Sequence, residues 1–241
     1  MSYQYRSDLE HQIAVRRHRP DFLVDDHLQF VAGAPELLHK RNYPVPEVQS
    51  PFLHIGNGTR FGGCFRKGFE GILRVVNPKE DEVQGIKVFH DARELPATDM
   101  AIMVVAARFC PQYVELLARD KQVRAFIIIS AGFSEETHEG AVLEQQILDT
   151  CRRYGCALIG PNCIGLLTQW HHSVFTKPIP HLSPRGVDFI SGSGATAVFI
   201  LESAVMKGLQ FNSVWSVGNG RQIGIETVLE YMDEDFDPGR D

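Results

Sequence analysis

The chain has 241 residues, of which 44% are hydrophobic and 22% charged, and this is the composition of a globular protein with one large or two smaller domains. Its formal net charge of -6 argues against a nucleic-acid partner, and no apolar run approaches the roughly 20 residues that a membrane span needs. Five cysteines without a C-x-x-C pair indicate neither a disulfide framework nor a metal site, so we expect a cytoplasmic protein.

Residues 1–50 differ in pattern from the rest of the chain and are predicted to form a helical amino-terminal extension. Ser7 and Glu10 have the spacing of a capping box before a short helical run, which Pro20 is expected to end. A second apolar run begins at Phe22. We interpret the segment as a helical appendage that packs on the main body, with a partner-binding arm as the alternative.

From residue 52 the chain alternates short apolar runs with helical stretches, which is typical of a parallel sheet with crossover helices. Between the runs, residues 111–118 and 140–154 carry apolar residues at helical spacing. The pattern predicts a Rossmann-like, doubly wound α/β domain over residues 51–168. Its five strands are expected at residues 52–55, 73–76, 101–105, 125–129 and 157–159.

A proline-containing stretch, residues 169–185, is predicted to be a linker to a second α/β domain over residues 186–241. Two strand–helix units are expected there, with strands at 187–190 and 213–217 and helices at 196–207 and 225–232. Two strands cannot bury both faces of a doubly wound sheet, and so small a domain is marginally stable. We therefore expect either a fragment of a longer chain or a domain that borrows its remaining sheet from a partner.

A glycine-rich turn follows the first predicted strand and leads into a helix. Such a turn lets the backbone approach a phosphate, whose negative charge the helix N-terminus favours. A strand–helix turn without a ligand is the alternative. The turn comprises Gly56, Asn57, Gly58, Thr59 and Arg60.

Lys79 follows the second predicted strand, where an NAD-binding unit would carry an acidic residue for the ribose hydroxyls. A cation at this position suits a phosphorylated ribose, as in NADP or in the 3'-phosphoadenosine end of coenzyme A. An ordinary exposed lysine is the simpler interpretation of Lys79 taken alone.

Four linked motifs occur in order along the chain: Val75–Lys79 with Glu82–Lys87, Ile128–Phe133, Ile159–Gly165, and Phe189–Ala195 with Ser216–Gly220. Together they resemble the CoA-binding and adjacent ligase domains of ADP-forming acetyl-CoA synthetases and, more distantly, the alpha subunit of succinyl-CoA synthetase. The resemblance covers about residues 50–238. It implies a Rossmann-like CoA-binding domain followed by a partial flavodoxin-like α/β domain.

The resemblance further implies that CoA binds across the carboxyl ends of the strands of the first domain, where open α/β sheets generally bind ligands. Residues 57–60 would meet the pyrophosphate and Lys79 a phosphate, while Asn162 and Cys163 would lie near the thiol. For Cys163, a small buried apolar role is the alternative to a covalent one. The adenine and pantetheine path would be lined by Val105, Ala106, Arg108, Ile129 and Ser130.

A second anion site is expected where a helix begins directly after a strand, because free N–H groups and the helix dipole favour negative charge there. By resemblance, this loop receives the phosphate of a phosphohistidine that relays a phosphoryl group between the nucleotide and the acid. A serine-capped helix without a ligand is the alternative. The loop comprises Ser191, Gly192, Ser193, Gly194, Ala195 and Thr196.

The chain departs from the family pattern at three places, which puts acyl or nucleotide specificity in doubt. Gly192 replaces a frequent Gln, Ala106 a frequent Pro, and the pair 57–58 a small Ala-Ser pair. The phosphohistidine itself is expected past Asp241, and none of the histidines here has its glycine-flanked setting. Those considered are His54, His138, His171 and His172.

The sequence therefore predicts the CoA-binding portion of a nucleoside-diphosphate-forming acyl-CoA synthetase, which converts acyl-CoA, ADP or GDP, and phosphate into acid, CoA and a nucleoside triphosphate. We expect the chain alone to be inactive and to bind CoA and phosphate. ADP or ATP and Mg²⁺ would bind only in the remaining ligase and ATP-grasp domains, in cis or in a separate subunit of an oligomer. A non-catalytic CoA sensor or scaffold and an NADP-dependent oxidoreductase are the alternatives.

Overall fold

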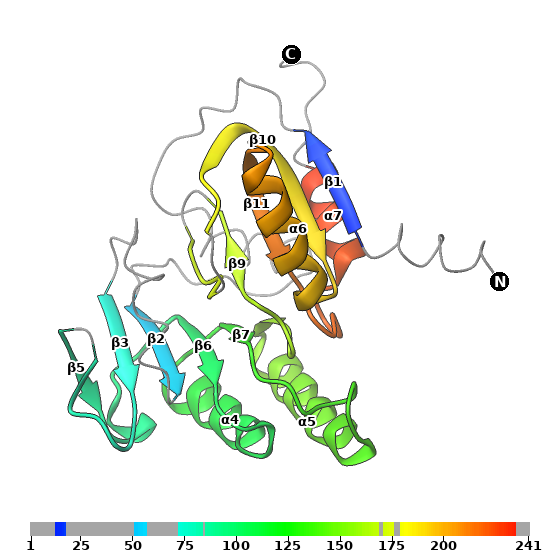
Figure 1. The fold of residues 1–241 in the computed structure, drawn as a ribbon. Helices are drawn as coiled ribbons and strands as arrows, with labels where there is room; N and C mark the ends of the chain where they lie inside the picture. The colour runs from blue at the N-terminus through cyan, green and yellow to red at the C-terminus, as the bar shows by residue number, and fades with distance from the viewer. Residues whose placement is uncertain are drawn as a thin grey trace.

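The structure is a computed structural model that describes residues 72–83, 85–168, 171–175 and 179–234, together with the backbone of two strands, Ile13–Arg17 (β1) and Pro51–Gly56 (β2). A seven-stranded sheet and a four-stranded sheet form two lobes, one above the other in Figure 1. Among the described residues, the helices are too short or too polar to cross a membrane.

The seven-stranded sheet has the order β4-β5-β3-β2-β6-β7-β8. Each pair of neighbours from β3 to β8 is parallel, which confirms the predicted doubly wound sheet. The strand order reverses between β2 and β6, and ligands of open α/β sheets bind at such a reversal. The bounds are Ile72–Val76 for β3, Met100–Val104 for β6, Ala125–Ile128 for β7 and Ala157–Ile159 for β8.

The central strands are apolar throughout because both faces of the sheet are covered. Phe126 and Ile128 of β7 pack in the cluster beneath the helices, whereas Ile127 between them packs in the cluster on the opposite face. Alternate side chains of a strand point to opposite faces, so a strand buried on both sides needs an unbroken apolar run. The predicted strands were recognisable for this reason.

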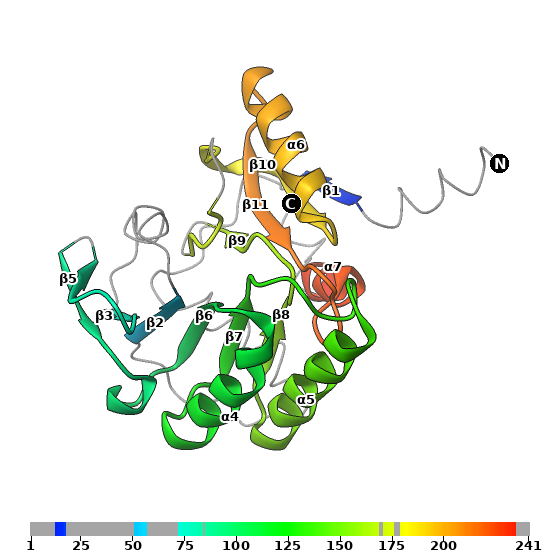
Figure 2. The same ribbon diagram turned by 60° about the horizontal axis from the view of Figure 1, so that its bottom comes forward.

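Two helices cover one face of this sheet, as Figure 2 shows. They are α4 (Cys110–Asp120), which has Pro111 in its first turn, and α5 (His138–Tyr154). The side chain of Thr137 caps α5 by accepting a hydrogen bond from the Gly140 N–H at 2.9 Å, and Gly155 ends it in a left-handed conformation. Both helices were predicted within a few residues of these bounds.

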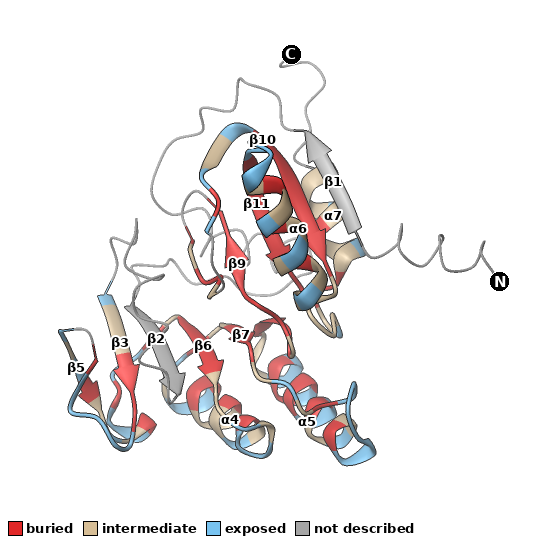
Figure 3. Cartoon of the chain, in the orientation of Figure 1, coloured by how far each residue is buried: buried red, intermediate tan, exposed pale blue. Residues whose placement is uncertain are grey.

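The four-stranded sheet has the order β1-β10-β11-β9. Its central strands, β10 (Leu182–Ser191) and β11 (Phe211–Ser216), are parallel, and helices α6 (Gly194–Met206) and α7 (Ile225–Glu234) follow them in turn. These are the two predicted strand–helix units. Figure 3 shows the buried strands beside α6, whose outer side is exposed.

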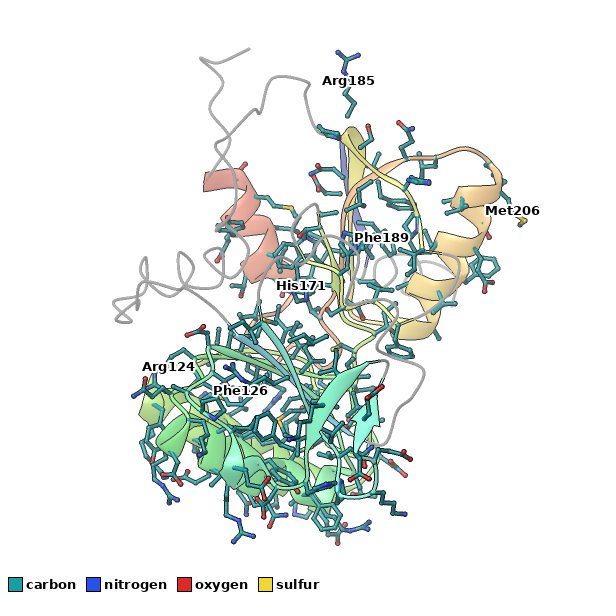
Figure 4. All side chains as sticks on the ribbon, turned by 90° about the vertical axis from the view of Figure 1, so that its left-hand side faces the viewer. Arg124, Phe126, His171, Arg185, Phe189 and Met206 are labelled. Atoms are coloured by element: carbon teal, nitrogen blue, oxygen red, sulfur yellow. The ribbon has the colours of Figure 1, made fainter. Side chains whose placement is uncertain are left out.

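The second lobe also covers the other face of the seven-stranded sheet. Ile102 and Ile127 of that sheet belong to the same buried cluster as Trp215 of β11 and Val228 of α7. Figure 4 places His171 between the lobe of Phe126 and the lobe of Phe189. The two sheets therefore share a hydrophobic core.

Three expectations are corrected. Ile13–Arg17 forms a strand antiparallel to β10, where a helical run was expected; the other residues of 1–50 lie outside the described part. Residues 171–175 of the expected linker include the buried His171, Ser173 and Val174, and Val174 packs in the hydrophobic core of the second lobe. The second sheet has four strands rather than two, since it gains β1 and β9 (Leu166–Leu167).

The first sheet likewise gains a hairpin that was not predicted. Its strands, β4 (Glu82–Val83) and β5 (Ile86–Phe89), pair antiparallel, and β5 extends the sheet beside β3. Short 3-10 helices at Ala92–Glu94 (η1) and Ala107–Phe109 (η2) were not predicted either. The domain boundaries stay predictions.

Candidate functional site

Four loops leave the carboxyl ends of parallel strands and therefore lie along one edge of the seven-stranded sheet. They follow β3, β6, β7 and β8, at residues 77–81, 105–109, 129–137 and 160–165. Eight of the thirteen predicted CoA-binding residues fall in these loops. Gly56 ends β2 at the same edge, and Asn57, Gly58, Thr59 and Arg60 lie outside the described residues.

The loop after β3 is held by Asn77, which is buried with 4% of its surface exposed. Its side-chain oxygen accepts a hydrogen bond from the backbone N–H of Lys79 at 2.9 Å, and its own N–H donates to the carbonyl of Phe89 at 3.0 Å. These bonds fix a turn that leaves Lys79 exposed. The hydrogen-bonded turn thus holds Lys79 at the carboxyl edge of the sheet.

The loop after β6 combines exposed and half-buried residues. Val105 is half-buried, whereas Ala106 and Arg108 are exposed. The guanidinium carbon of Arg108 lies 4.6 Å from the centroid of the Phe109 ring, a cation–π arrangement. This loop therefore combines a cation, a flat ring and the small apolar side chains of Val105 and Ala106 at the carboxyl end of β6.

The loops after β7 and β8 are joined to one another. Ile129 is buried and donates its N–H to Met103 at 3.0 Å, while the carbonyl of Ser130 accepts the N–H of Asn162 at 2.9 Å. Asn162 has a left-handed backbone with φ of 59°. The predicted pantetheine path and the predicted thiol end are therefore in direct contact.

Cys163 lies in the core. Only 3% of its surface is exposed, and its thiol donates a hydrogen bond to the carbonyl of Ile128 at 3.3 Å. Burial raises the pKa of Cys163 to about 12. Because the thiolate is the nucleophilic form, this environment supports a structural rather than a covalent role.

The loop before α6 is organised by its own serines. The Ser193 hydroxyl oxygen caps the helix by accepting from the Thr196 N–H at 3.3 Å, and the Thr196 hydroxyl also donates to it at 3.0 Å. The buried Ser191 hydroxyl accepts from the Ser193 N–H at 3.1 Å. The N–H groups of Gly194 and Ala195 have no intrahelical acceptor, because they lie in the first turn.

The structure brings the predicted thiol end and the predicted phosphate loop together. A Cβ atom on Gly194 would lie 2.8 Å from the side chain of Ile164, and one on Gly192 would lie 3.6 Å from the carbonyl of Gly218. The Ile164 N–H donates to the Ser216 hydroxyl at 3.1 Å. The two predicted ligand loops, one from each lobe, therefore lie side by side.

The histidines considered as phosphoryl carriers differ in their surroundings. His171 is buried, and burial together with neighbouring His172 lowers its pKa to about 3, so it is neutral. His138 is exposed at the start of α5, and His54 lies in β2. The described part of the chain has no group of three His, Cys, Asp or Glu side chains placed to hold a metal ion.

A residue that contacts the two neighbouring loops without belonging to either was not predicted to have a role. Asn219, in the turn after β11, donates its side-chain amide to carboxylates of Glu135 and Glu144 in the first lobe. The sequence contained a signal for it, because Asn219 lies within the motif Ser216–Gly220. That motif had been assigned to the family resemblance without a role.

Two protein families match the chain. Residues 68–169 match the CoA binding domain, and residues 184–238 match the succinyl-CoA ligase like flavodoxin domain. The Archaeoglobus fulgidus acetate–CoA ligase [ADP-forming] I is 35% identical over 70% of this chain and 25% of its own length. The Pyrococcus furiosus acetate–CoA ligase [ADP-forming] II subunit alpha is 34% identical over 67% of this chain and 35% of its own length.

Solved structures agree in fold. The protein PH0766 of Pyrococcus horikoshii OT3 has a TM-score of 0.70 at 27% identity, over 78% of this chain and 44% of that one. The Ca. Korarchaeum cryptofilum dinucleotide forming acetyl-coenzyme A synthetase 1 has a TM-score of 0.66 at 21% identity, over 79% and 46%. The chain therefore contains a CoA-binding domain followed by a succinyl-CoA ligase-like flavodoxin domain, and it is homologous to the CoA-binding part of the ADP-forming acyl-CoA synthetases.

Proposed function

We propose that the chain binds CoA along the carboxyl edge of the seven-stranded sheet, as the CoA-binding part of a nucleoside-diphosphate-forming acyl-CoA synthetase. The observation that carries the proposal is the contact between the loop of Asn162 and the loop of Ser193. In a reaction that joins an acyl phosphate to a thiol, the thiol and the phosphate must meet. Two neighbouring ligand loops bring a bound thiol and a bound phosphate close together.

Within this proposal the loops divide the ligand between them. Lys79 takes a phosphate of the 3'-phosphoadenosine end, because its ammonium is exposed on a fixed turn. Arg108 with Phe109 and the backbone of Ile129–Ser130 line the adenine and pantetheine path, and Asn162 lies at the thiol. The loop Ser191–Thr196 takes inorganic phosphate or a phosphoryl group.

The complete reaction is proposed to be that of the curated relatives, whose names give acetate–CoA ligase [ADP-forming]. It would convert acyl-CoA, ADP or GDP, and phosphate into acid, CoA and a nucleoside triphosphate. Nucleotide and Mg²⁺ would bind in further ligase and ATP-grasp domains, in cis or, as the relatives named subunit alpha suggest, in a separate subunit. We further propose an oligomeric assembly in the cytoplasm.

Calorimetric titration with CoA, desulfo-CoA and NADP tests the binding proposal. CoA and desulfo-CoA should bind with similar affinity, because Cys163 is buried and forms no bond with the thiol, and NADP should bind more weakly. Lys79→Ala should weaken CoA binding about tenfold or more, since a charge-assisted bond contributes roughly 1.5–3 kcal/mol. Lys87→Ala, which removes an exposed lysine of the nearby β5, is the matched control and should bind as the unmodified chain.

Three results would each contradict a part of the proposal. Tighter binding of NADP than of CoA would favour the oxidoreductase alternative. Equal CoA affinity in the Lys79 and Lys87 variants would remove Lys79 from the site. The sensor or scaffold alternative would be favoured if the chain binds CoA but forms no acyl-CoA when a nucleotide-binding partner subunit is added.

A further inference from the structure

The turn Gly218–Gly220 contacts both proposed ligand loops through its backbone. The N–H of Asn219 donates to the carbonyl of Pro161 at 2.9 Å, beside the proposed thiol end of CoA. The N–H of Val217, just before the turn, donates to the carbonyl of Ser191 at 3.0 Å, where the proposed phosphate loop begins. The turn is therefore a physical bridge between the two loops.

The side chain of Asn219 extends this bridge into the first lobe. Its nitrogen Nδ2 lies 2.6 Å from Oε2 of Glu135, 2.9 Å from Oε1 of Glu144 and 3.4 Å from Oγ of Ser134. Its oxygen Oδ1 lies 3.5 Å from Nδ2 of Asn162. A primary amide has two N–H donors, and here both face carboxylates, which are strong acceptors.

Glu135 connects this amide to the loop after β7. Its other oxygen, Oε1, accepts the backbone N–H of Gly132 at 2.7 Å and that of Phe133 at 3.1 Å. These residues directly follow Ile129–Ser130, the proposed lining of the pantetheine path. A displacement of this loop by a ligand would therefore move the carboxylate that holds Asn219.

Glu144 fixes the orientation of the amide. The Glu144 side chain on α5 is 2% exposed, and the nearest cation, Arg221, has its Nε 3.8 Å from Oε2. A buried carboxylate needs hydrogen-bond donors to offset its lost hydration. If Asn219 turned away, Glu144 would lose its close donor, so the amide is held in a single orientation.

We propose that Asn219 is a positioning residue that transmits CoA occupancy from the loops after β7 and β8 to the Ser191–Thr196 loop. CoA bound against Ser130 and Asn162 fixes their backbone, Glu135 and Asn162 fix Asn219, and Asn219 orders the phosphate loop through Val217. This inference rests on the proposed function, because CoA is the ligand whose binding is transmitted. It assigns a role to a residue that touches neither ligand.

Hydrogen exchange of the full chain, with and without saturating CoA, tests the proposal. In the unmodified chain, CoA should slow amide exchange of the peptide spanning Ser191–Thr196 about fivefold or more, the lower end of ordinary coupling between sites. In Asn219→Ala the same peptide should change less than about twofold. CoA affinity measured by calorimetry should stay within about threefold, because Asn219 is not in contact with CoA.

Gln145→Ala is the matched control. Gln145 donates its amide to the carboxylate of Asp149 at 2.9 Å; both residues are exposed on α5, and this bond involves neither Asn219 nor Glu144. This variant should keep the full effect of CoA on the loop. Asn219→Ser, which retains one donor, should show an intermediate effect of CoA on the loop. It replaces Asn219→Ala in the exchange experiment if the alanine variant fails to fold.

The outcomes separate this inference from the proposed function. If CoA does not bind the unmodified chain, the proposed function fails. The positioning role is then tested without ligand. Amide hydrogen exchange of residues 191–196 must still be faster in Asn219→Ala than in Gln145→Ala; otherwise the positioning role is rejected. If CoA binds and slows exchange equally in the Asn219→Ala and unmodified chains, or leaves the loop unchanged in both, the inference alone is overturned.

Discussion

Gly218 lies where the turn after β11 meets the carbonyl groups of Pro161 and Asn162. Its φ is 58°, and a Cβ atom there would lie 2.1 Å from the Pro161 oxygen and 2.6 Å from that of Asn162. Both oxygens belong to the backbone, so they cannot move aside as the end of a flexible side chain would. Gly218→Ala should therefore lower the free energy of unfolding by about 3 kcal/mol or more, as measured by urea denaturation.

Gly192 provides the comparison within the same site. A Cβ atom there would meet nothing closer than 3.6 Å, and its backbone does not require glycine. Gly192→Ala, and also Gly192→Gln, should change the free energy of unfolding by less than about 1 kcal/mol. Equal losses at positions 192 and 218 would show that the two lobes do not approach one another at Gly218.

Glu135 links stability to pH. The pKa of its carboxyl is lowered from its ordinary value, because hydrogen bonds from Asn219, Phe133 and Gly132 outweigh the opposing effect of burial. A lowered pKa contributes stability that is present above the ordinary carboxyl range and is lost as pH falls through the lowered value. Glu135→Gln should thus be less stable than the unmodified chain at neutral pH, with the difference shrinking towards pH 3.

Thermal unfolding of both proteins between pH 3 and pH 8 measures this difference. Glu136→Gln, at an exposed neighbouring carboxylate, is the control and should show no such trend. A stability difference for Glu135→Gln that grows on acidification would have the wrong sign. It would exclude the ionised carboxylate as the acceptor of the Asn219 amide.

At the scale of residues, local motifs located the loops but not the contacts between them. The positions of Lys79, Asn162 and the Ser191–Thr196 loop after strands could be predicted, because each follows a recognisable apolar run; their ligand-binding roles stay predictions. The contacts of Asn219 could not be predicted, since its partners Glu135 and Glu144 lie 84 and 75 positions away in sequence. No periodicity or spacing encodes a contact at such a separation.

Among the elements, β8 is at the edge of the seven-stranded sheet, and a side chain from the second lobe caps it. The Gln222 side-chain oxygen accepts the N–H of Leu158 at 2.6 Å, and its nitrogen donates to the carbonyl of Cys156 at 3.0 Å. The amide thus replaces the backbone of a neighbouring strand. Edge strands need such protection, because their free groups otherwise pair with other chains.

Gln222→Ala should lower the free energy of unfolding by about 2 kcal/mol, because it leaves buried backbone groups of Leu158 and Cys156 without this partner. Chemical denaturation gives the loss, and size-exclusion chromatography should show increased self-association. Gln112→Ala, at an exposed position of α4, should change neither. Unaltered stability on loss of Gln222 would mean that water satisfies the edge equally well.

The elements that were predicted and those that were missed differ in what forms them. The parallel neighbours β3, β2, β6, β7 and β8 each contain an apolar run of their own. By contrast, β4 and β9 have two residues each, too few for any pattern. They are strands because β5 and β11 offer them hydrogen-bonding partners, and a partner strand cannot be inferred from two residues alone.

For the whole molecule, the shared core predicts cooperative unfolding. Ile127 of the first sheet and Trp215 and Val228 of the second lobe belong to one buried cluster, so neither lobe can unfold without exposing the other's apolar surface. Calorimetry should show a single transition. Tryptophan fluorescence and far-ultraviolet circular dichroism should give the same midpoint, and two separate transitions would contradict the shared core.

The domain organisation inferred from sequence missed this core. The second face of the first sheet was expected to be covered by its own helices, and residues 169–185 were expected to be a linker. Composition cannot distinguish a proline-containing linker from a buried connection, because Val174 is buried only through its packing with distant residues such as Phe189 and Val214 of the second lobe. The two α/β units were predicted, but their packing on one another was not.

The shared core also limits how such proteins can be recombined. A chimera that exchanges only the CoA-binding half, with its junction placed in the proline-containing stretch, would pair Ile102 and Ile127 with a foreign α7 and expose mismatched apolar surface. A transplant of the first sheet should therefore include α7 and the turn before it. The part that must be exchanged as one unit is the packed pair of lobes, not either lobe by itself.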